Sequence, residues 1–441
     1  MPQVQSTPRS TAVPRARRRT GEWLTVAVFL LPALVVIGAL LIYPIFFTFV
    51  RSTFDASGST FVGLENYQRI FTEPRTLIAL RNNVIWVVVA PAIVTSLGLV
   101  FAVLADRIPW RTAFKMSLFM PLVVSGLAAG VTFRFVYAVD PEVGLANAIV
   151  STVVHAVRPP GAFPNARPSQ AEAFERVDLA WRAAEHTAPG DTIAIGLVGI
   201  PPFQLPPEAQ AASPPPSAAA DAISGVVWLD FSPGGTAGVV DEGERGLPSI
   251  ALDLLDGGRT VAQTTSGPDG SFAFTGVADG TYRVQLAGSN FRPPFGGLPW
   301  LAPMLVTPSI IIGYIWIQTG FALIILGAGL AGINRDLQDS ARVEGANEWQ
   351  VFRFITVPLL RPILTVVFVT TVISVLKVFD LVLVIAPESV QYHANVLALE
   401  MWRASFGGAR DFGLGSALAA LLFVMIIPAM FFNLRRFRME V

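Results

Sequence analysis

The sequence predicts an α-helical polytopic membrane protein with six transmembrane helices and an inserted all-β sandwich domain. Two observations support the membrane part: 53% of the 441 residues are hydrophobic and only 14% are charged, whereas soluble domains carry about 25% charged residues. The third observation is an abrupt change in the middle of the chain, from apolar stretches to Pro-rich and then alternating sequence. This change indicates a non-helical insertion between two sets of helices.

Six stretches reach the roughly 20 apolar residues that a bilayer-spanning helix needs. No small-residue cleavage site follows the first, and Arg51 comes directly after Val50, so we expect it to stay in the membrane and not to be cleaved as a signal peptide. The predicted spans run roughly over 24–49, 84–105, 116–139, 304–332, 363–386 and 413–434.

Loop charges predict the orientation of these spans, because cytoplasmic loops collect Lys and Arg. Basic residues concentrate in the N-terminal tail, in the loops after the second and fourth spans, and at the C-terminal end. Both termini are therefore expected in the cytoplasm of a multi-pass protein of the cell membrane. The predicted organisation is a basic cytoplasmic tail (1–22), helices 1–3 (23–157), an extracytoplasmic linker (158–222), an extracytoplasmic sandwich (223–290) and helices 4–6 with a cytoplasmic loop at 336–362 (291–441).

Composition also excludes several classes of function. The net charge of zero gives no electrostatic case for a nucleic-acid partner, and the absence of cysteine removes disulfides and thiolate chemistry. The three histidines are scattered without ligand spacing, and no Ser-His-Asp or paired-carboxylate arrangement stands out. A Walker loop ends in Gly-Lys-Ser/Thr, but Lys115 follows Phe114 and Lys377 follows Leu376. We therefore expect a chain that is not an enzyme, binds no cofactor and leaves any use of ATP to a partner subunit.

The insertion begins with a Pro/Ala-rich region, 158–222, which is typical of an extended linker. Within it, the spacing of apolar residues predicts a helix over 171–186, and 191–200 reads as a strand. From 223 to 290 short alternating segments are separated by turn residues, as in a small β-sandwich.

The segments GVVWLD (225–230), DEGE (241–244), GLP (246–248), DGSF (269–272) and GTY (280–282) resemble the SdrD-B-like, or collagen-adhesin B-type, repeat domains of Gram-positive surface adhesins. That resemblance covers about 68 residues. It implies weak calcium candidates at Asp230, Asp241 and Glu244, although Ser232 to Thr236 replace the Asn/Asp ligands of that family. The alternative is an acidic turn exposed to solvent, because calcium needs six or more oxygen ligands.

The loop after the fourth span reads DLQDSARVEGANEWQVFRFITVPLLRPIL (336–364). Helical spacing over 340–353 brings Ala341, Gly345, Trp349 and Phe352 toward one face of a predicted helix. Gly345 would cost that helix about 1 kcal/mol relative to Ala, but it would let another chain approach closely. Without further information, this segment could be an ordinary amphipathic helix at the membrane interface.

The same loop resembles the EAA loop of binding-protein-dependent ABC importer permeases, in which Glu-Ala-Ala is followed by Gly, Ile and Pro at fixed distances. Asp339 and Ser340 replace the first two residues of that pattern. In the family this loop is the coupling helix, which sits in a cleft of the ATPase subunit. The positions that the resemblance assigns to ATPase coupling are Asp339, Ala341, Glu344, Gly345, Ala346, Trp349, Phe352, Ile355 and Pro358.

The rest of the helical sequence is similar to sugar permeases of the maltose and α-glucoside type, as in FVGLENYQRIF (61–71), DPEVGLAN (140–147) and VLKVFDLVLVIA (375–386). The resemblance implies a maltose-type permease fold that forms half of a sugar pathway. Its implied partners are ABC ATPase subunits, a second permease subunit in a heterodimer, an extracytoplasmic solute-binding protein and the lipid bilayer. Lys377 and Asp380 lie within the fifth predicted span, where ionisable groups are costly. They either pair at i, i+3 on one helix face or line the substrate pathway.

Two other functions compete with the permease. A secondary transporter would show internal repeats, and none is convincing here. A membrane-anchored surface adhesin or sensor would act through residues 223–290.

Overall fold

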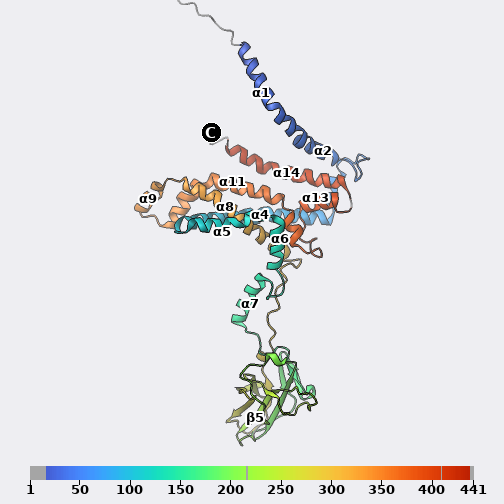
Figure 1. Ribbon diagram of the computed structural model, residues 1–441, viewed down its shortest axis with the longest axis vertical. Helices are drawn as coiled ribbons and strands as arrows, with labels where there is room; N and C mark the ends of the chain where they lie inside the picture. The colour runs from blue at the N-terminus through green and yellow to red at the C-terminus, as the bar shows by residue number, and fades with distance from the viewer. Residues whose placement is uncertain (1–15, 215–216, 409, 438–441) are drawn as a thin grey trace, which may run out of the picture. The chain divides into compact units, whose positions relative to one another are not determined.

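The computed structural model describes residues 16–214, 217–408 and 410–437 (Figure 1). It divides into two compact units, Met1–Arg134 with Trp300–Val441, and Phe135–Pro299. Residues 1–15 of the predicted basic tail lie outside the described part, and the first helix begins at Ala16. The first unit holds the long helices and the second holds the β-strands.

The helices of the first unit come in two sets separated by the second unit. The first set comprises α1 (Ala16–Ile37), the π-helical turn η1 (Gly38–Ile42), α2 (Tyr43–Arg51), α3 (Glu65–Ile70), α4 (Pro74–Arg107), α5 (Arg111–Val123) and α6 (Gly126–Val136). The second comprises α8 (Val306–Ala331), α9 (Arg335–Val343), α10 (Glu348–Val351), η5 (Phe352–Thr356), α11 (Val357–Leu376), α12 (Asp380–Ile385), α13 (Leu397–Phe406) and α14 (Phe412–Phe437).

Among the described residues, five helices are long and apolar enough to cross a membrane, or six if the bent pair α5 and α6 is counted as one span. The helical polytopic fold predicted from composition is therefore confirmed. α5 and α6 meet at 102°, because Val124, which directly follows α5, is extended (φ −71°, ψ 133°), and Pro121 lies in the last turn of α5. The span predicted over 363–386 is wrong at its end, since α11 stops at Leu376.

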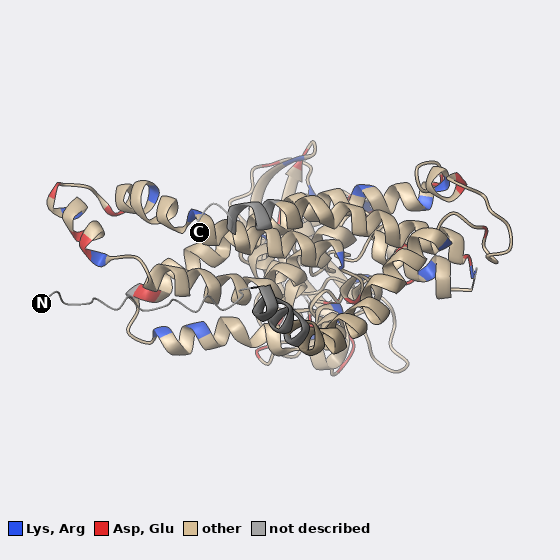
Figure 2. Ribbon diagram, turned by 90° about the horizontal axis from the view of Figure 1, so that it is seen from above, with Lys and Arg blue, Asp and Glu red and all other residues tan. Residues whose placement is uncertain are grey.

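The long helices pack around an apolar core shared by α4, α8 and α11. Small residues let α4 and α8 approach closely, and a Cβ placed on Gly98 would collide with Ala322. Figure 2 shows Lys, Arg, Asp and Glu gathered toward the ends of the long helices, as the cost of charge in a bilayer requires. The buried residues of this core are Val94, Leu99, Ala102, Ala105, Ala322, Leu323, Leu326, Leu360 and Val367.

The second unit contains the short helix α7 (Leu145–Val157) and, within the described residues, two five-stranded sheets. One sheet has the order β1-β4-β5-β6 with β9 also on β5, and the other has the order β2-β3-β10-β7-β8. The strands are β1 (Arg167–Pro168), β2 (Phe174–Val177), β3 (Ala180–Ala183), β4 (Thr192–Val198), β5 (Ala222–Leu229), β6 (Arg245–Gly246), β7 (Ala251–Asp256), β8 (Arg259–Thr265), β9 (Ser271–Thr275) and β10 (Arg283–Leu286).

The sandwich is larger than the sequence predicted, because its sheets include strands from the predicted linker. β4 pairs in parallel with β5, which is buried at every position. The strand expected over 191–200 is confirmed by β4, but the helix expected over 171–186 is wrong. β2 and β3 form a hairpin there, with Asp178 at φ 54° in its tight turn, and Phe174 and Trp181 pack against the core of the sandwich.

The chain enters and leaves the strands at adjacent points. Gly161 N–H donates to Arg292 O at 2.9 Å, and Phe163 N–H donates to Asn290 O at 3.0 Å. Domains whose ends lie close together are readily inserted into other folds and removed from them. The two ends of the strand-bearing segment are therefore already held side by side.

Candidate functional site

The loop between α8 and α11 is built from two short helices joined by a tight turn. α9 begins after Asn334, whose side chain accepts a hydrogen bond from Asp336 N–H at 3.0 Å. This side chain satisfies one of the N–H groups that a helix start leaves unpaired. The loop is thus an ordered extension of the helical unit, and α9 starts four residues after α8 ends.

Gly345 ends α9 and does not lie inside a helix. Its φ of +93° is in the left-handed region, which glycine adopts without the steric cost that a Cβ adds. Gly345 N–H donates to Arg342 O, and Ala346 N–H donates to Ala341 O, both at 3.0 Å. These two bonds form a Schellman motif. The single continuous helix predicted over 340–353 is therefore wrong.

A second helix begins directly after this turn. Asn347 Oδ1 accepts from Gln350 N–H at 2.8 Å, and Gln350 Oε1 accepts from Asn347 N–H at 2.7 Å. This reciprocal pair is a capping box, and it starts α10, which continues through η5 into α11. Asn-x-x-Gln is a readable signal in the sequence, so the break could have been predicted from it.

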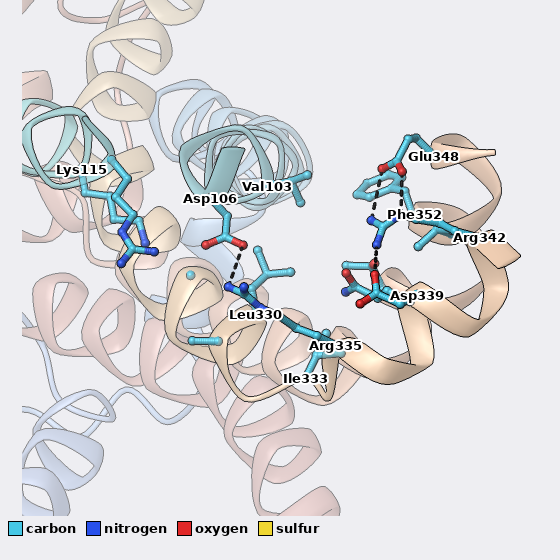
Figure 3. A pocket seen from close by; sticks show the side chains of 16 residues that line it. Val103, Asp106, Lys115, Leu330, Ile333, Arg335, Asp339, Arg342, Glu348 and Phe352 are labelled. Carbon is cyan, nitrogen blue, oxygen red and sulfur yellow. Dashed lines mark hydrogen bonds and ion pairs between the residues drawn. The ribbon is translucent and has the colours of Figure 1, made fainter. Parts of the chain in front are cut away.

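An arginine joins the two helices. Arg342 Nη1 lies 2.7 Å from Asp339 Oδ1 on α9, and Arg342 Nε lies 2.8 Å from Glu348 Oε1 on α10. The hydrogen bond to Glu348, followed by the one to Asp339, raises the pKa of the guanidinium above its ordinary value. We call these three residues the α9–α10 clamp (Figure 3). The spacing of residues in the sequence did not predict this clamp.

The outer surface of the loop is apolar and exposed. Val343, Trp349 and Phe354 are 89%, 67% and 70% exposed, although large apolar side chains normally seek burial. Exposed apolar clusters mark sites of protein or membrane contact. Val343 and Phe354 did not emerge from the sequence, which gave no indication that their side chains face outward.

The predicted coupling residues do not all lie together. Phe352 packs toward the helical core, Trp349 is exposed beside it with ring centroids 5.5 Å apart, and Pro358 lies in the first turn of α11. Asp339 lines a cavity that lies behind the loop. The other predicted residues share a groove of about 360 Å³, lined by Ala341, Glu344, Gly345, Ala346, Gln350, Val351, Phe354 and Ile355.

Lys377 and Asp380 do not form the predicted pair on one helix face. α11 ends before Lys377, and α12 starts at Asp380 after Phe379, whose φ of −142° and ψ of −59° are not helical. Lys377 is exposed and Asp380 is half-buried. A Cβ on Gly126, the first residue of α6, would collide with the Asp380 carboxylate. Gly126 therefore provides the space that Asp380 occupies.

This contact predicts a specific stability effect. Gly126→Ala should destabilise the chain by about 1–3 kcal/mol, the usual cost of overpacking, visible as a lower midpoint in thermal unfolding of the purified protein. The matched background is Asp380→Ala, in which the colliding carboxylate is gone. If Gly126→Ala lowers the midpoint equally in both backgrounds, the collision is not the cause.

The three calcium candidates of the sandwich bind the backbone of their own loop. Asp230 accepts from Gly238 N–H at 2.6 Å, and Glu244 accepts from Asp241 N–H at 3.0 Å. Asp241 accepts from Thr236 N–H at 2.8 Å. Within the described residues, no group of three or more His, Cys, Asp or Glu side chains is placed to hold a metal ion. The geometry favours the acidic turn, but Asp230 and Glu244 are buried and not exposed to solvent.

Comparison with known proteins agrees with the helical architecture. Residues 290–437 match the model of the family described as binding-protein-dependent transport system inner membrane component. The osmoprotective compounds uptake permease protein GgtC of Synechocystis is 27% identical over 93% of this chain and 98% of its own length. The α-glucoside transport system permease protein AglF of Rhizobium meliloti is 27% identical over 92% of this chain and 80% of its own length.

One solved structure has the same fold. It is a bacterial ABC transporter involved in the import of the acidic polysaccharide alginate, with a TM-score of 0.54, 15% identity and coverage of 95% of this chain and 98% of the matched chain. The adhesin alternative receives no support from these matches. Residues 290–437 carry the inner-membrane domain of the binding-protein-dependent transport systems, and over most of its length the chain is similar to uptake and transport-system permeases.

Proposed function

We propose that this chain forms half of the transmembrane pathway of an ATP-driven importer for a sugar, with α-glucosides as the first class to test. The observation that carries the proposal is the ordered α9–α10 loop, which presents an apolar, exposed surface at the end of two long helices. Such a surface suits contact with a partner whose movement must be passed on to the long helices. The name of the relative AglF, an α-glucoside transport system permease, supports the substrate class.

The proposed assembly contains two ATPase subunits, this chain, a second permease subunit and an extracytoplasmic solute-binding protein. ATP would be hydrolysed by the ATPase subunits, because this sequence has no Walker lysine. Asp339, Ala341, Glu344, Gly345, Ala346, Trp349, Phe352, Ile355 and Pro358 would contact the ATPase or hold the loop that does. Lys377 and Asp380 would lie at the interruption between α11 and α12, where a pathway through the helices can expose polar groups.

The test is reconstitution of the chain with its candidate ATPase, second permease and binding protein in lipid vesicles. We expect ATP-dependent uptake of a labelled α-glucoside that requires the binding protein. Uptake that continues without ATP would contradict the proposal and favour a secondary transporter. Uptake of another solute class under the same conditions would contradict only the substrate assignment.

Replacement of the strand-bearing segment distinguishes a permease function from an adhesin function. We expect that a short Gly-Ser linker in place of residues 164–289 will leave the helical unit folded and able to copurify with the ATPase, because the chain ends are already hydrogen-bonded side by side. Copurification and size-exclusion chromatography would measure this. Loss of the helical unit itself would show that the sandwich is part of its folding core and contradict the prediction.

A further inference from the structure

A cavity of about 580 Å³ lies behind the α9–α10 loop. Its walls come from the ends of α4 and α8, the start of α5 and the inner side of α9 and α10 (Figure 3). This volume is within the range of ligand-binding pockets. Asp106 and Ala331, which line it, are the last residues of two candidate membrane spans. The cavity therefore lies at the depth of the lipid headgroups if those helices cross the bilayer.

The charges around the cavity are distributed unevenly. At one end, Arg342 is satisfied by two carboxylates in the α9–α10 clamp. The other end has three cations, Arg111, Lys115 and Arg335, against the single carboxylate of Asp106. Arg335 lies 3.9 Å from Asp106 with both side chains largely exposed, and such pairs are weak. This end of the cavity, which we call the cationic end, keeps a surplus of positive charge.

The positions of Arg111 and Lys115 are electrostatically unfavourable unless an anion binds between them. The two residues are four positions apart on α5, so the two cations share a helix face and repel each other. Arg111 is the first residue of α5, where the helix dipole adds further positive potential. In the described part of the chain, neither has a carboxylate oxygen within 4.0 Å.

The side chain of Lys115 also extends toward the neighbouring helix α8. A Cβ on Gly327 of α8 would lie 3.6 Å from Lys115 Nζ, so the ammonium group is close to α8 where that helix lacks a side chain. Figure 3 shows Lys115 and Arg335 on different sides of Asp106, with both facing the cavity. Cations from α5 and α9 thus converge on one space at the end of the spans.

We propose that the cationic end binds a phosphate-bearing anion, and that its source is the headgroup of an anionic phospholipid. Phosphate oxygens accept charge-assisted hydrogen bonds from Arg and Lys, and basic pockets between transmembrane helices on the cytoplasmic side are suited to anionic headgroups. The inference goes beyond sugar import and depends on the proposed function only for the side of the membrane. A bound headgroup would fix the start of α5 against α9, next to the loop that contacts the ATPase.

The experiment is lipid binding to the full-length chain in detergent, followed by native mass spectrometry with phosphatidylglycerol and, separately, phosphatidylcholine. We expect phosphatidylglycerol to bind preferentially, and Arg111→Gln and Lys115→Gln each to weaken it about fivefold, the factor for one lost cation near an anionic headgroup. Lys115→Arg should keep the binding. Arg353→Gln is the matched control, because Arg353, in η5, is an exposed cation that does not line the cavity.

Competition with inorganic phosphate distinguishes the two sources of the anion. If phosphate binds with the same dependence on Arg111 and Lys115 while phosphatidylglycerol shows no preference, the site takes the anion from solution. The proposal is overturned if Arg353→Gln weakens binding as much as Lys115→Gln does, or if neither cavity variant changes it. The readout requires neither sugar nor ATP, so failure of the lipid site and failure of the proposed import function are separable.

Discussion

Gly345→Val is expected to reduce ATP-driven uptake about tenfold while leaving the chain expressed and inserted in the membrane. Gly345 has a φ of +93°, and a residue with a Cβ pays about 1–2 kcal/mol to adopt the left-handed region, with more for a β-branched side chain. That cost opposes the two hydrogen bonds that end α9. Uptake and ATP hydrolysis in reconstituted vesicles would measure the effect, and hydrolysis should persist when uptake falls.

The control is Gly345→Asn, since Asn is close to Val in size but tolerates the left-handed region. A Cβ at this position meets no other atom of the chain within 4 Å, so the positive φ is the reason within this chain to prefer glycine. We therefore expect Asn to retain at least half of the uptake. If Asn and Val are equally damaging, the glycine is needed for close approach of the ATPase and not for the turn.

Some features of the loop could be predicted from the sequence and others could not. The resemblance to the EAA pattern, whose Gly-to-Pro spacing is present in full, predicts the position of the loop and an ATPase as its partner. The helical spacing of apolar residues nevertheless predicted one helix, because Ala341 and Trp349 have the same periodicity across the break as within a helix. Gly345 and Asn347 carry the end and start signals, and these local signals outweigh the periodicity.

The remaining fold was predictable to a similar degree. The lengths of the apolar stretches located the candidate spans, because the thickness of the bilayer sets the length of a membrane-spanning helix. They did not reveal the 102° bend at Val124, since a backbone angle leaves no compositional trace. The hairpin at Asp178 was mistaken for a helix because its strands have only four residues each, too few for alternation to be distinguished from a helical period. The structure of that segment depends on pairing with strands that are distant in the sequence.

The α9–α10 clamp predicts the second large effect, because it fixes the angle between two helices that the turn alone would leave free. Arg342 bonds Asp339 within α9 and Glu348 across the turn. Arg342 and Glu348 are six residues apart, so no helical spacing relates them. Arg342→Glu would place three carboxylates together, and we expect uptake per ATP hydrolysed to fall about tenfold, with Arg342→Ala intermediate and Arg342→Lys close to the original chain.

Global stability should be almost unchanged in these variants, because exposed ion pairs contribute little to folding. The folded-state pKa of Arg342 is raised above its ordinary value, so the guanidinium stays charged and the clamp should give no pH dependence in the range where transport is measured. Arg353→Ala is the matched control, as Arg353 contacts the ring of Phe354 and takes no part in the clamp.

The ranking of the Arg342 variants by uptake shows whether the clamp orients α10 or only keeps the loop folded. If the clamp only stabilised the loop, uptake and ATP hydrolysis would decline together, and the thermal midpoint of the complex would follow them. If it sets the angle at which α10 meets the ATPase, hydrolysis continues while uptake fails, and Lys restores uptake because it keeps one of the two bonds. Equal damage by Arg353→Ala would contradict a specific role for Arg342, and the exposed apolar surface of Val343, Trp349 and Phe354 would then carry the coupling without it.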